Sequence, residues 1–362
     1  MFESQMKILI FIENDLIVRH FIFSKAFEKI NKEHDVVYVF PFGDKRMGDI
    51  NPLKLDLNQS KLRSLSPDPK RLKLWRLRFF VEKLRFRKEV SKKTLKRWHK
   101  DFKIGNPKYA LYLYLFFGFP IVFQIFTVIV NFLISQNPNK SLIKVLSEEK
   151  PDLLIHPSVL QGSYIDDVIF YGNKIKKPVL IIMNSWDNPT TKRSVVNKNY
   201  FLLVWGPQTK KHALQYMGLK NERVIEFGSA QFDIYNFENS EDWKSQRKLY
   251  GFDNNTKTLL YAGSSKYSDE FLHMKIIDEA ISKGDLPKIN VIYRPHPWGC
   301  CGHKGYRFKE YKFRNVKFDF NMREYILRDF DKVKTKFLPD LKFTKDLIKS
   351  VDLVISPLST IC

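Results

Sequence analysis

Val291-Ile-Tyr-Arg-Pro-His-Pro297 is the stretch of this 362-residue chain that decides its fold. Its β-branched start is typical of a buried strand in a parallel sheet, and Pro295 and Pro297 end that strand because proline has no N–H to donate. Arg294 and His296 are therefore expected at the carboxyl end of a strand, where open α/β sheets bind ligands. A cation and an imidazole at that place suit a phosphate group. The alternative is a strand-ending loop in which Arg294 is solvated and His296 caps the turn.

Short apolar runs on both sides of this stretch alternate with segments of helical periodicity, which predicts doubly wound parallel sheets. We expect strands at residues 6–12, 35–40, 152–156, 178–183, 200–205, 223–227, 257–262, 291–294 and 353–356. We expect helices at residues 16–30, 72–84, 166–174, 208–217, 243–250, 268–283, 321–331 and 344–351. Asp15 is a possible N-cap of the first helix. No G-x-G-x-x-G follows the first strand, which disfavours a nicotinamide dinucleotide.

The predicted organisation is two Rossmann-like α/β domains. The first domain spans residues 1–235 and carries a helical insertion at about residues 61–140; a linker follows at 236–256, and the second domain covers 257–362. The chain is 44% hydrophobic, so it can bury two cores, and its three cysteines exclude a disulfide scaffold. A reducing, cytoplasmic location is therefore expected.

The net charge of +23 favours phosphate-rich partners, although an A/T-rich genome would also enrich lysine. Residues 61–103 hold 17 Lys/Arg and 4 Asp/Glu, so they contribute 17 − 4 = +13. Residues 72–84 mix apolar and basic side chains at helical spacing, which suits an anionic membrane surface. A helix packed on its own domain and an RNA-binding helix are the alternatives, but stacking aromatics on strands are missing. We expect no nucleic-acid partner.

The most apolar segment is the uncharged 24-residue run at 111–134. It is long enough for a membrane span, yet Gly118, Pro120, Gln124 and Asn131 interrupt it. We favour two shorter helices broken at Pro120 over a span. With the basic helix before them, they predict a peripheral anchor at residues 61–134 on the inner face of the plasma membrane.

Several motifs, in order and spacing, resemble the GT-B-fold glycosyltransferases that build bacterial capsule and other surface polysaccharides. The resemblance covers residues 150–362 well and the first 40 residues only as a generic Rossmann start. The motifs are Ser185-Trp-Asp-Asn188 with Lys192, Trp205-Gly206, Gly228-Ser-Ala-Gln-Phe-Asp233, Leu260-Tyr-Ala-Gly-Ser-Ser265, Tyr293-Arg-Pro-His-Pro297 and Asp352-Leu-Val-Ile-Ser-Pro-Leu-Ser-Thr360.

The resemblance implies a glycosyltransferase that moves a sugar from a nucleotide-sugar donor to a surface-polysaccharide or lipid-linked acceptor. The second domain would bind the donor, the first would bind the acceptor, and no metal or cofactor would be needed. The expected donor-binding residues are Gly263, Ser264, Ser265, Arg294, His296, Ser359 and Thr360. In such proteins the Ser-Thr pair leads into a helix that carries a glutamate. The resemblance therefore implies that this sequence, which ends at Cys362, is truncated.

Inverting glycosyl transfer needs a carboxylate or histidine that takes the acceptor proton. Four candidates follow expected strands or lie near their ends: Glu13, His20, His156 and Asp187. Each has a structural alternative, namely a turn-holding carboxylate or a satisfied core histidine. The cluster around Cys300, Cys301 and His303 lacks the usual zinc spacing, so no metal site is expected.

Two other functions fit the same sequence. A teichoic-acid-type polyol-phosphate transferase has a similar fold and would release CMP from a CDP-linked donor; a sugar-nucleotide 2-epimerase is also possible. From a different class, the chain could be a non-catalytic basic protein that binds membranes or nucleic acid, for which a steep salt dependence would be diagnostic.

Overall fold

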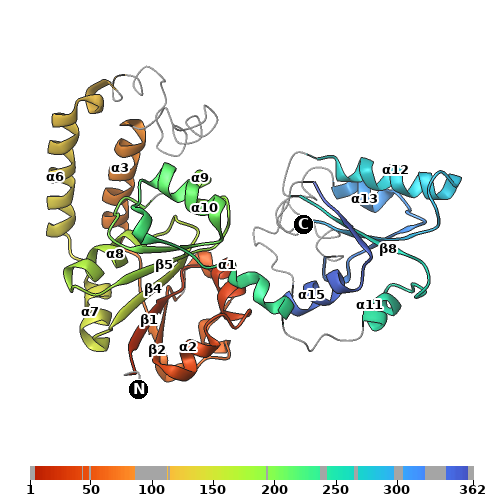
Figure 1. Cartoon of the computed structure of the whole chain (residues 1–362), viewed down its shortest axis with the longest axis horizontal. Helices are drawn as coiled ribbons and strands as arrows, with labels where there is room; N and C mark the ends of the chain where they lie inside the picture. The colour runs from red at the N-terminus through yellow and green to blue at the C-terminus, as the bar shows by residue number, and fades with distance from the viewer. Residues whose placement is uncertain are drawn as a thin grey trace. The chain divides into compact units, whose positions relative to one another are not determined.

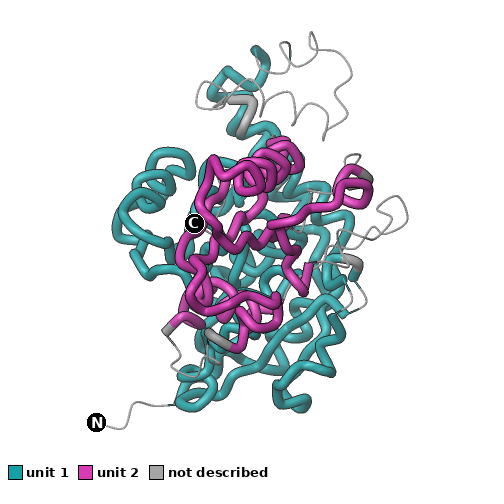
Figure 2. The backbone as a smooth tube through the Cα atoms, turned by 90° about the vertical axis from the view of Figure 1, so that its right-hand side faces the viewer, with its two compact units in different colours: residues 1–230 teal, residues 231–362 magenta. Residues whose placement is uncertain are grey.

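The computed structural model describes residues 5–42, 44–48, 50–85, 112, 115–192, 195–236, 243–264, 268–296, 305–322 and 340–357. The chain divides between Ala230 and Gln231 into two compact units (Figure 2). Each unit is a parallel β-sheet with helices on both faces (Figure 1). The predicted fold class, two doubly wound Rossmann-like domains, is therefore confirmed.

The first unit is built on a seven-stranded parallel sheet of order β3-β2-β1-β4-β5-β6-β7. The chain winds outward from β1 in one direction and then restarts at β4 on the other side of β1, so the switch point lies between β1 and β4. Its strands are β1 (Lys7–Phe11), β2 (Asp35–Phe40), β3 (Leu62–Ser64), β4 (Leu153–Ser158), β5 (Val179–Met183), β6 (Phe201–Val204) and β7 (Val224–Glu226).

Both faces of this sheet are apolar because side chains alternate along each strand and both sides are covered. Leu9 and Phe11 pack under α7 (Lys140–Glu149) and α8 (Ile165–Lys174). Ile8, Ile10 and Ile12 pack under α1 (Asp15–Ile17) and the π-helical turn that continues it, with α2 (Glu28–Glu33) beyond. The short helices α9 (Asn188–Thr191) and α10 (Pro207–His212) follow β5 and β6.

Three local predictions for this unit are wrong. The helix expected at residues 16–30 is broken: α1 passes into a π-helical turn at Val18–Ile22, and α2 begins only at Glu28. Its N-cap is Asn14, whose side chain accepts from the Ile17 N–H at 3.0 Å, and not Asp15. Strand β4 continues through Pro157 to Ser158 rather than ending at residue 156, because pairing with β1 stops at Ile155 while pairing with β5 goes on.

Helices α3 (Pro69–Arg85) and α6 (Pro120–Gln136) form a two-helix arm on one side of the first unit (Figure 1). They pack through Trp75 and Phe79 of α3 against Val130 and Ile134 of α6. The predicted break at Pro120 is confirmed: Phe119 is extended, with φ −69° and ψ 122°, and the helix begins at the proline after it.

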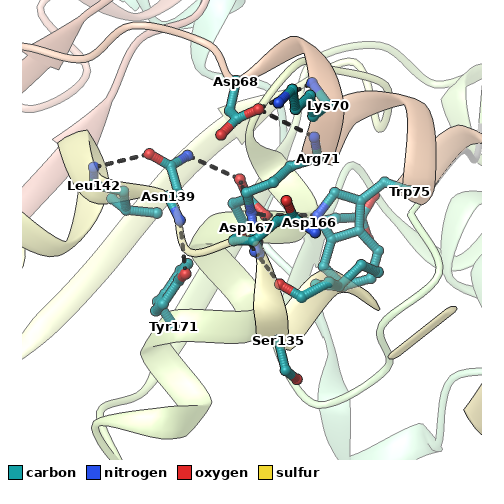
Figure 3. Close-up of polar contacts among 12 residues, drawn as sticks. Asp68, Lys70, Arg71, Trp75, Ser135, Asn139, Leu142, Asp166, Asp167 and Tyr171 are labelled. Atoms are coloured by element: carbon teal, nitrogen blue, oxygen red, sulfur yellow. Dashed lines mark hydrogen bonds and ion pairs between the residues drawn. The ribbon is translucent and has the colours of Figure 1, made fainter. Parts of the chain in front are cut away.

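A buried ion pair fixes the base of the two-helix arm (Figure 3). The Arg71 guanidinium donates to the Asp167 carboxylate of α8 from Nε at 2.9 Å and from Nη2 at 2.7 Å. The same carboxylate accepts from Trp75 Nε1 at 2.6 Å and from Asn139 Nδ2 at 2.9 Å. Arg71 Nη1 donates to the carbonyl oxygens of Ile134 and Asn137, which lie at the C-terminal end of α6. One arginine therefore joins α3, α6 and α8.

The carboxylate of Asp166, the residue before Asp167, has different hydrogen-bond partners. Asp166 accepts from the Val196 N–H at 3.0 Å. Because it is fully buried, desolvation raises its pKa to about 7. Of these adjacent acids, Asp167 holds the two-helix arm and Asp166 holds the segment before β6.

The second unit contains a four-stranded parallel sheet of order β10-β9-β8-β11. One face packs under α12 (Glu270–Lys283) and α13 (Gly305–Glu310), and the other under α11 (Trp243–Leu249) and α15 (Leu341–Lys349). The switch point lies between β8 and β11. The strands are β8 (Thr258–Ala262), β9 (Asn290–Arg294), β10 (Val316–Phe318) and β11 (Leu353–Ile355).

Five strands and α-helices of the structure were not predicted from the sequence: β3, β10, α7, α9 and α13. Of the helix expected at 321–331, the structure describes only Asn321 and Met322, which are helical; the remainder lies outside the described residues.

Replacing Arg71 with alanine is expected to destabilise the first unit by about 3–5 kcal/mol, because the Asp167 carboxylate would stay buried without its cation. Denaturant unfolding followed by circular dichroism measures the change. Arg76→Ala, an exposed position on the same helix, is the matched control and should stay within about 0.5 kcal/mol of the wild type. Equal stability of the two variants would contradict this role for Arg71.

Candidate functional site

The four predicted catalytic residues all come from the carboxyl edge of the first sheet, at the ends of the adjacent strands β1, β4 and β5. Glu13 and His20 follow β1, His156 lies near the end of β4, and Asp187 follows β5. This is the edge where doubly wound sheets bind ligands. The four side chains nevertheless differ in what they contact and in how far they reach solvent.

Glu13 caps a helix. Its carboxylate is 2% exposed and accepts from the backbone N–H groups of Ser163 at 2.6 Å and Tyr164 at 2.9 Å, at the start of α8. Gly162 makes room for it, because a Cβ there would lie 1.9 Å from Glu13 Oε2. The Glu13 carboxylate therefore fixes the start of α8 beside the end of β1, at the switch point of the sheet.

His156 is fully buried between aromatic rings. It stacks on Phe11 with ring centroids 6.2 Å apart and meets Tyr164 edge-on at 5.6 Å. Its Nδ1 lies 3.0 Å from the Pro157 carbonyl oxygen. Desolvation lowers its pKa, so the imidazole is neutral at physiological pH.

His20 bridges the ends of β1 and β5. Its Nδ1 lies 2.8 Å from Asn184 Oδ1, and the side chain is 9% exposed. Burial is the largest influence on the imidazole and lowers its pKa to about 4, against the opposing hydrogen bond to Asn184. His20 is therefore a neutral hydrogen-bond donor that ties the two loops together.

Asp187 is partly exposed, unlike the other three. Its Oδ1 accepts from Ser185 Oγ at 2.7 Å, and its Oδ2 accepts from Thr191 Oγ1 at 2.9 Å. Its backbone carbonyl accepts from the first turn of α9. The resemblance motif at residues 185–188 is thus a compact turn, with the Trp186 side chain 46% exposed beside it.

Sequence reasoning missed Arg46, which also reaches this edge. Its guanidinium lies 3.9 Å from the Glu13 carboxylate and 2.9 Å from the Asp44 carboxylate. The hydrogen bond from Arg46 lowers the pKa of Asp44. The available signal was a cation shortly after the predicted second strand, at the same edge as Glu13.

In the second unit, the expected phosphate loop is held by a carboxylate. Glu270, the first residue of α12, accepts from the Ser264 N–H at 2.6 Å and from Tyr293 Oη at 2.6 Å. A Cβ on Gly263 would lie 2.4 Å from Glu270 Oε2, so this close approach requires glycine. Burial raises the pKa of Glu270. The Ser264 amide is therefore engaged by the protein itself.

Arg294 is brought beside this loop, because the Gly263 N–H donates to the Arg294 carbonyl oxygen at 2.7 Å. Its guanidinium is not solvated: the side chain is 5% exposed, forms an ion pair with Asp319 at 3.1 Å and donates to Thr344 Oγ1 at 2.8 Å. His296 is half-buried at the end of the same strand, and burial lowers its pKa.

A shallow cavity of about 380 Å³, open to solvent and with an almost wholly apolar surface, lies at the switch point between β8 and β11. Its polar feature is the Tyr261 hydroxyl, which lies 2.6 Å from His273 Nδ1. Sequence reasoning missed both residues, although Tyr261 ends a predicted strand. The lining residues are Tyr261, His273, Ile276, Ile277, Ile355, Ser356 and Pro357.

Three of the predicted donor-binding residues, Ser265, Ser359 and Thr360, lie outside the described residues, as do Cys300, Cys301 and His303. Within the part of the chain that the structure describes, no group of three or more His, Cys, Asp or Glu side chains could hold a metal ion.

No protein-family profile and no curated protein matches this chain. It is similar to UDP-N-acetylglucosamine 2-epimerase from Rickettsia bellii, with 10% identity over 98% of this chain and 74% of that chain, and a TM-score of 0.48. The corresponding enzyme from Neisseria meningitidis, bound to UDP-GlcNAc, is 12% identical over 97% of this chain and 77% of that chain, with a TM-score of 0.48. A glycosyltransferase from Rickettsia africae is 10% identical to this chain, over 88% of this chain and 70% of that chain, with a TM-score of 0.45.

His20 makes stability depend on pH in a defined direction. Its pKa is about 4 in the folded state and 6.5 ordinarily, so between these values the unfolded chain binds more protons. Stability is therefore full above pH 6.5 and falls by up to about 3 kcal/mol towards pH 4.

Unfolding free energies of wild type and His20→Gln, measured from about pH 8 to about pH 4.5, test this dependence. The glutamine amide can still donate to Asn184 but does not titrate, so its curve should be flatter. His156 titrates in both proteins and cancels in the difference. Parallel curves would show that His20 is not held neutral.

Proposed function

We propose that this chain is a glycosyltransferase, moving a sugar from a nucleotide-sugar donor to a hydroxyl of a surface-polysaccharide or lipid-linked acceptor. The observation that carries the proposal is the cavity at the switch point of the second sheet, which has the size of a small-molecule site. The order of the motifs at residues 185–188, 228–233, 260–265, 293–297 and 352–360 supports the same activity.

The proposal assigns the nucleoside to this cavity. Ile276 and Ile277 offer apolar surface to a base, and the Tyr261–His273 pair offers hydrogen bonds to a ribose or a base edge. The diphosphate is assigned to the ends of β8 and β9. Because Glu270 already accepts the Ser264 amide, the groups assigned to the phosphates are His296 and the Ser264 hydroxyl, which lies 3.1 Å from Ser268 Oγ.

Arg294, which the sequence predicted as a donor-binding residue, has an indirect role in this proposal because its guanidinium already contacts Asp319 and Thr344. Its charge is partly offset by Asp319, and its guanidinium ties β9 to α15. It therefore acts on the diphosphate through the field at the strand end and by holding the loop, together with Gly263 behind it. No cofactor or metal enters this scheme.

The proton acceptor in the proposal is Asp187, because it is partly exposed while Glu13, His20 and His156 are buried and already hydrogen-bonded. As the acceptor oxygen bonds to the sugar C1, the bond from C1 to the diphosphate oxygen breaks. The acceptor proton passes to the Asp187 carboxylate, and the nucleoside diphosphate leaves. Glu13, His20 and His156 then position the loops around it.

Calorimetric titration of UDP, GDP, CDP and CMP into the full chain tests the donor site. We expect saturable binding of one nucleoside diphosphate, weakened at least about tenfold in His273→Ala and in His296→Ala, since each removes a hydrogen-bonding group. His212→Ala, in the first unit, is the matched control and should bind like the wild type.

The nucleotide preference separates the related functions. Preference for CDP and CMP would replace the proposal with polyol-phosphate transfer. Absence of binding by all four nucleotides in a folded chain would overturn the nucleotide-sugar activity. Binding that survives both histidine changes would move the site away from the cavity.

Asp187→Asn is expected to lower the transfer rate by about 100- to 10,000-fold and to leave nucleotide affinity unchanged, since the amide cannot accept the proton. Nucleotide sugars that carry the nucleotide named by the titration would be incubated with a total lipid extract, and release of the nucleoside diphosphate would be measured. Asp152→Asn, a hydrogen-bonded aspartate at the opposite edge of the sheet, is the matched control. An unchanged rate would assign the proton to another group.

A further inference from the structure

The outer face of α6 is an exposed, mainly apolar surface, bordered by the exposed side chains of Gln124, Ser135 and Gln136. Ile121, Ile125, Val128, Ile129 and Phe132 are exposed by 71, 55, 67, 52 and 60% and recur at the spacing of one helix face. Phe119, just before the helix, is 64% exposed and extends the patch. We call these six residues the α6 outer face. An apolar surface of this kind marks an interaction site rather than an ordinary protein surface.

The other side of α6 already has its partner. Val130 and Ile134 are buried against Trp75 and Phe79 of α3. The helix contains no charged residue in its 17 positions, and among the residues that the structure describes only its inner side packs against other side chains. The α6 outer face therefore needs an external apolar environment.

The arrangement favours a helix that lies along a bilayer surface over one that crosses it. No single helix in the described ranges is long and apolar enough to cross a bilayer, although α6 and α7, bent by 66°, would pass together by length and composition. The structure uses α7 otherwise: Leu142, Val145 and Leu146 are buried in the core of the first unit. A helix of 17 residues is about 25 Å long, less than the roughly 30 Å of hydrocarbon in a bilayer.

The charge beside α6 selects the kind of surface. Helix α3 has seven Lys/Arg residues and one glutamate in its sequence. Lys70, Lys73 and Arg76 are exposed, so their charges act on whatever approaches the two-helix arm within a Debye length of about 8–10 Å. An anionic lipid surface supplies both the apolar environment and the opposite charge.

A second copy of the chain fits this surface less well. A symmetric dimer would place the same patch of each copy together, and with it two basic α3 helices. Their like charges would oppose association, whereas they attract a membrane that contains acidic lipids.

We propose that the two-helix arm is a membrane-docking element: the α6 outer face inserts into the interfacial layer of an anionic bilayer, parallel to its plane, and the exposed cations of α3, which packs on the opposite side of α6, attract the acidic bilayer at longer range. This inference does not depend on the proposed transferase activity. It places the chain on a lipid surface, where a lipid-linked acceptor would be found.

Vesicle sedimentation of the full chain tests the docking. Wild type is expected to bind vesicles of phosphatidylcholine with about 30 mol % phosphatidylglycerol and to bind pure phosphatidylcholine much more weakly. Ile125→Gln/Val128→Gln/Phe132→Gln should reduce binding by about 100-fold, because it removes apolar area without changing charge. Lys73→Gln/Arg76→Gln should reduce binding by about tenfold.

Leu249→Gln is the matched control, because Leu249 is an exposed leucine, at 53%, on a helix of the second unit. It should bind vesicles like the wild type. All substituted positions are exposed, so circular dichroism and thermal midpoints should stay at wild-type values. An alkaline carbonate wash should release the bound chain, as expected for a helix that does not span.

Four results would overturn the proposal. Wild type that ignores anionic vesicles removes the docking element, and a triple variant that binds like wild type removes the α6 outer face from it. If ultracentrifugation without lipid shows a wild-type dimer that the triple variant converts to monomer, the face is a contact between copies. Resistance to carbonate would replace surface docking with insertion across the bilayer.

Discussion

The pairing of Arg71 with Asp167 is the interaction on which the first unit depends, because it is the point where an insertion joins a sheet. The guanidinium satisfies a buried carboxylate and two carbonyl groups at the end of α6 at once. A lysine at this buried position could not do this, since its ammonium group lacks the planar fork of donors. The ion pair thereby fixes the position of α3 relative to the end of α6, and the apolar side chains of the two helices pack in that arrangement.

The sequence predicted most of the fold because its strands are short apolar runs ended by Gly, Pro or polar residues. The predicted strands at 35–40, 178–183 and 257–262 match the observed ones almost to the residue. The three-residue strands β3 and β10 were missed because each has a basic residue at its centre and no continuous apolar run. The equally short β7 and β11 were predicted because each contains adjacent β-branched residues. The irregular path between Asp15 and Glu33 was missed because a π-helical turn has the same composition as an α-helix.

The candidate site was predicted less fully, and for a physical reason. Sequence order places Glu13, His156 and Arg294 at strand ends, but it does not say what their polar atoms contact. In the fold, Glu13 caps α8, His156 lies between two rings, and Arg294 faces Asp319. These partners are distant in sequence or contribute backbone groups. The Tyr261–His273 pair was invisible for the same reason, because it depends on the angle at which α12 packs on β8.

The same arginine has a consequence for the order of events during synthesis. Its carboxylate partner lies 96 positions later in the chain, so the base of the arm cannot close until Asp167 has left the ribosome. The apolar helix that ends at Gln136 is made 167 − 136 = 31 residues earlier. At 5–20 residues per second it waits roughly 2–6 s without its anchor. We expect this interval to be visible as protease sensitivity of α6 in ribosome-bound chains that are long enough to expose α6 but not Asp167, and its absence would mean that α3 and α6 pair on their own.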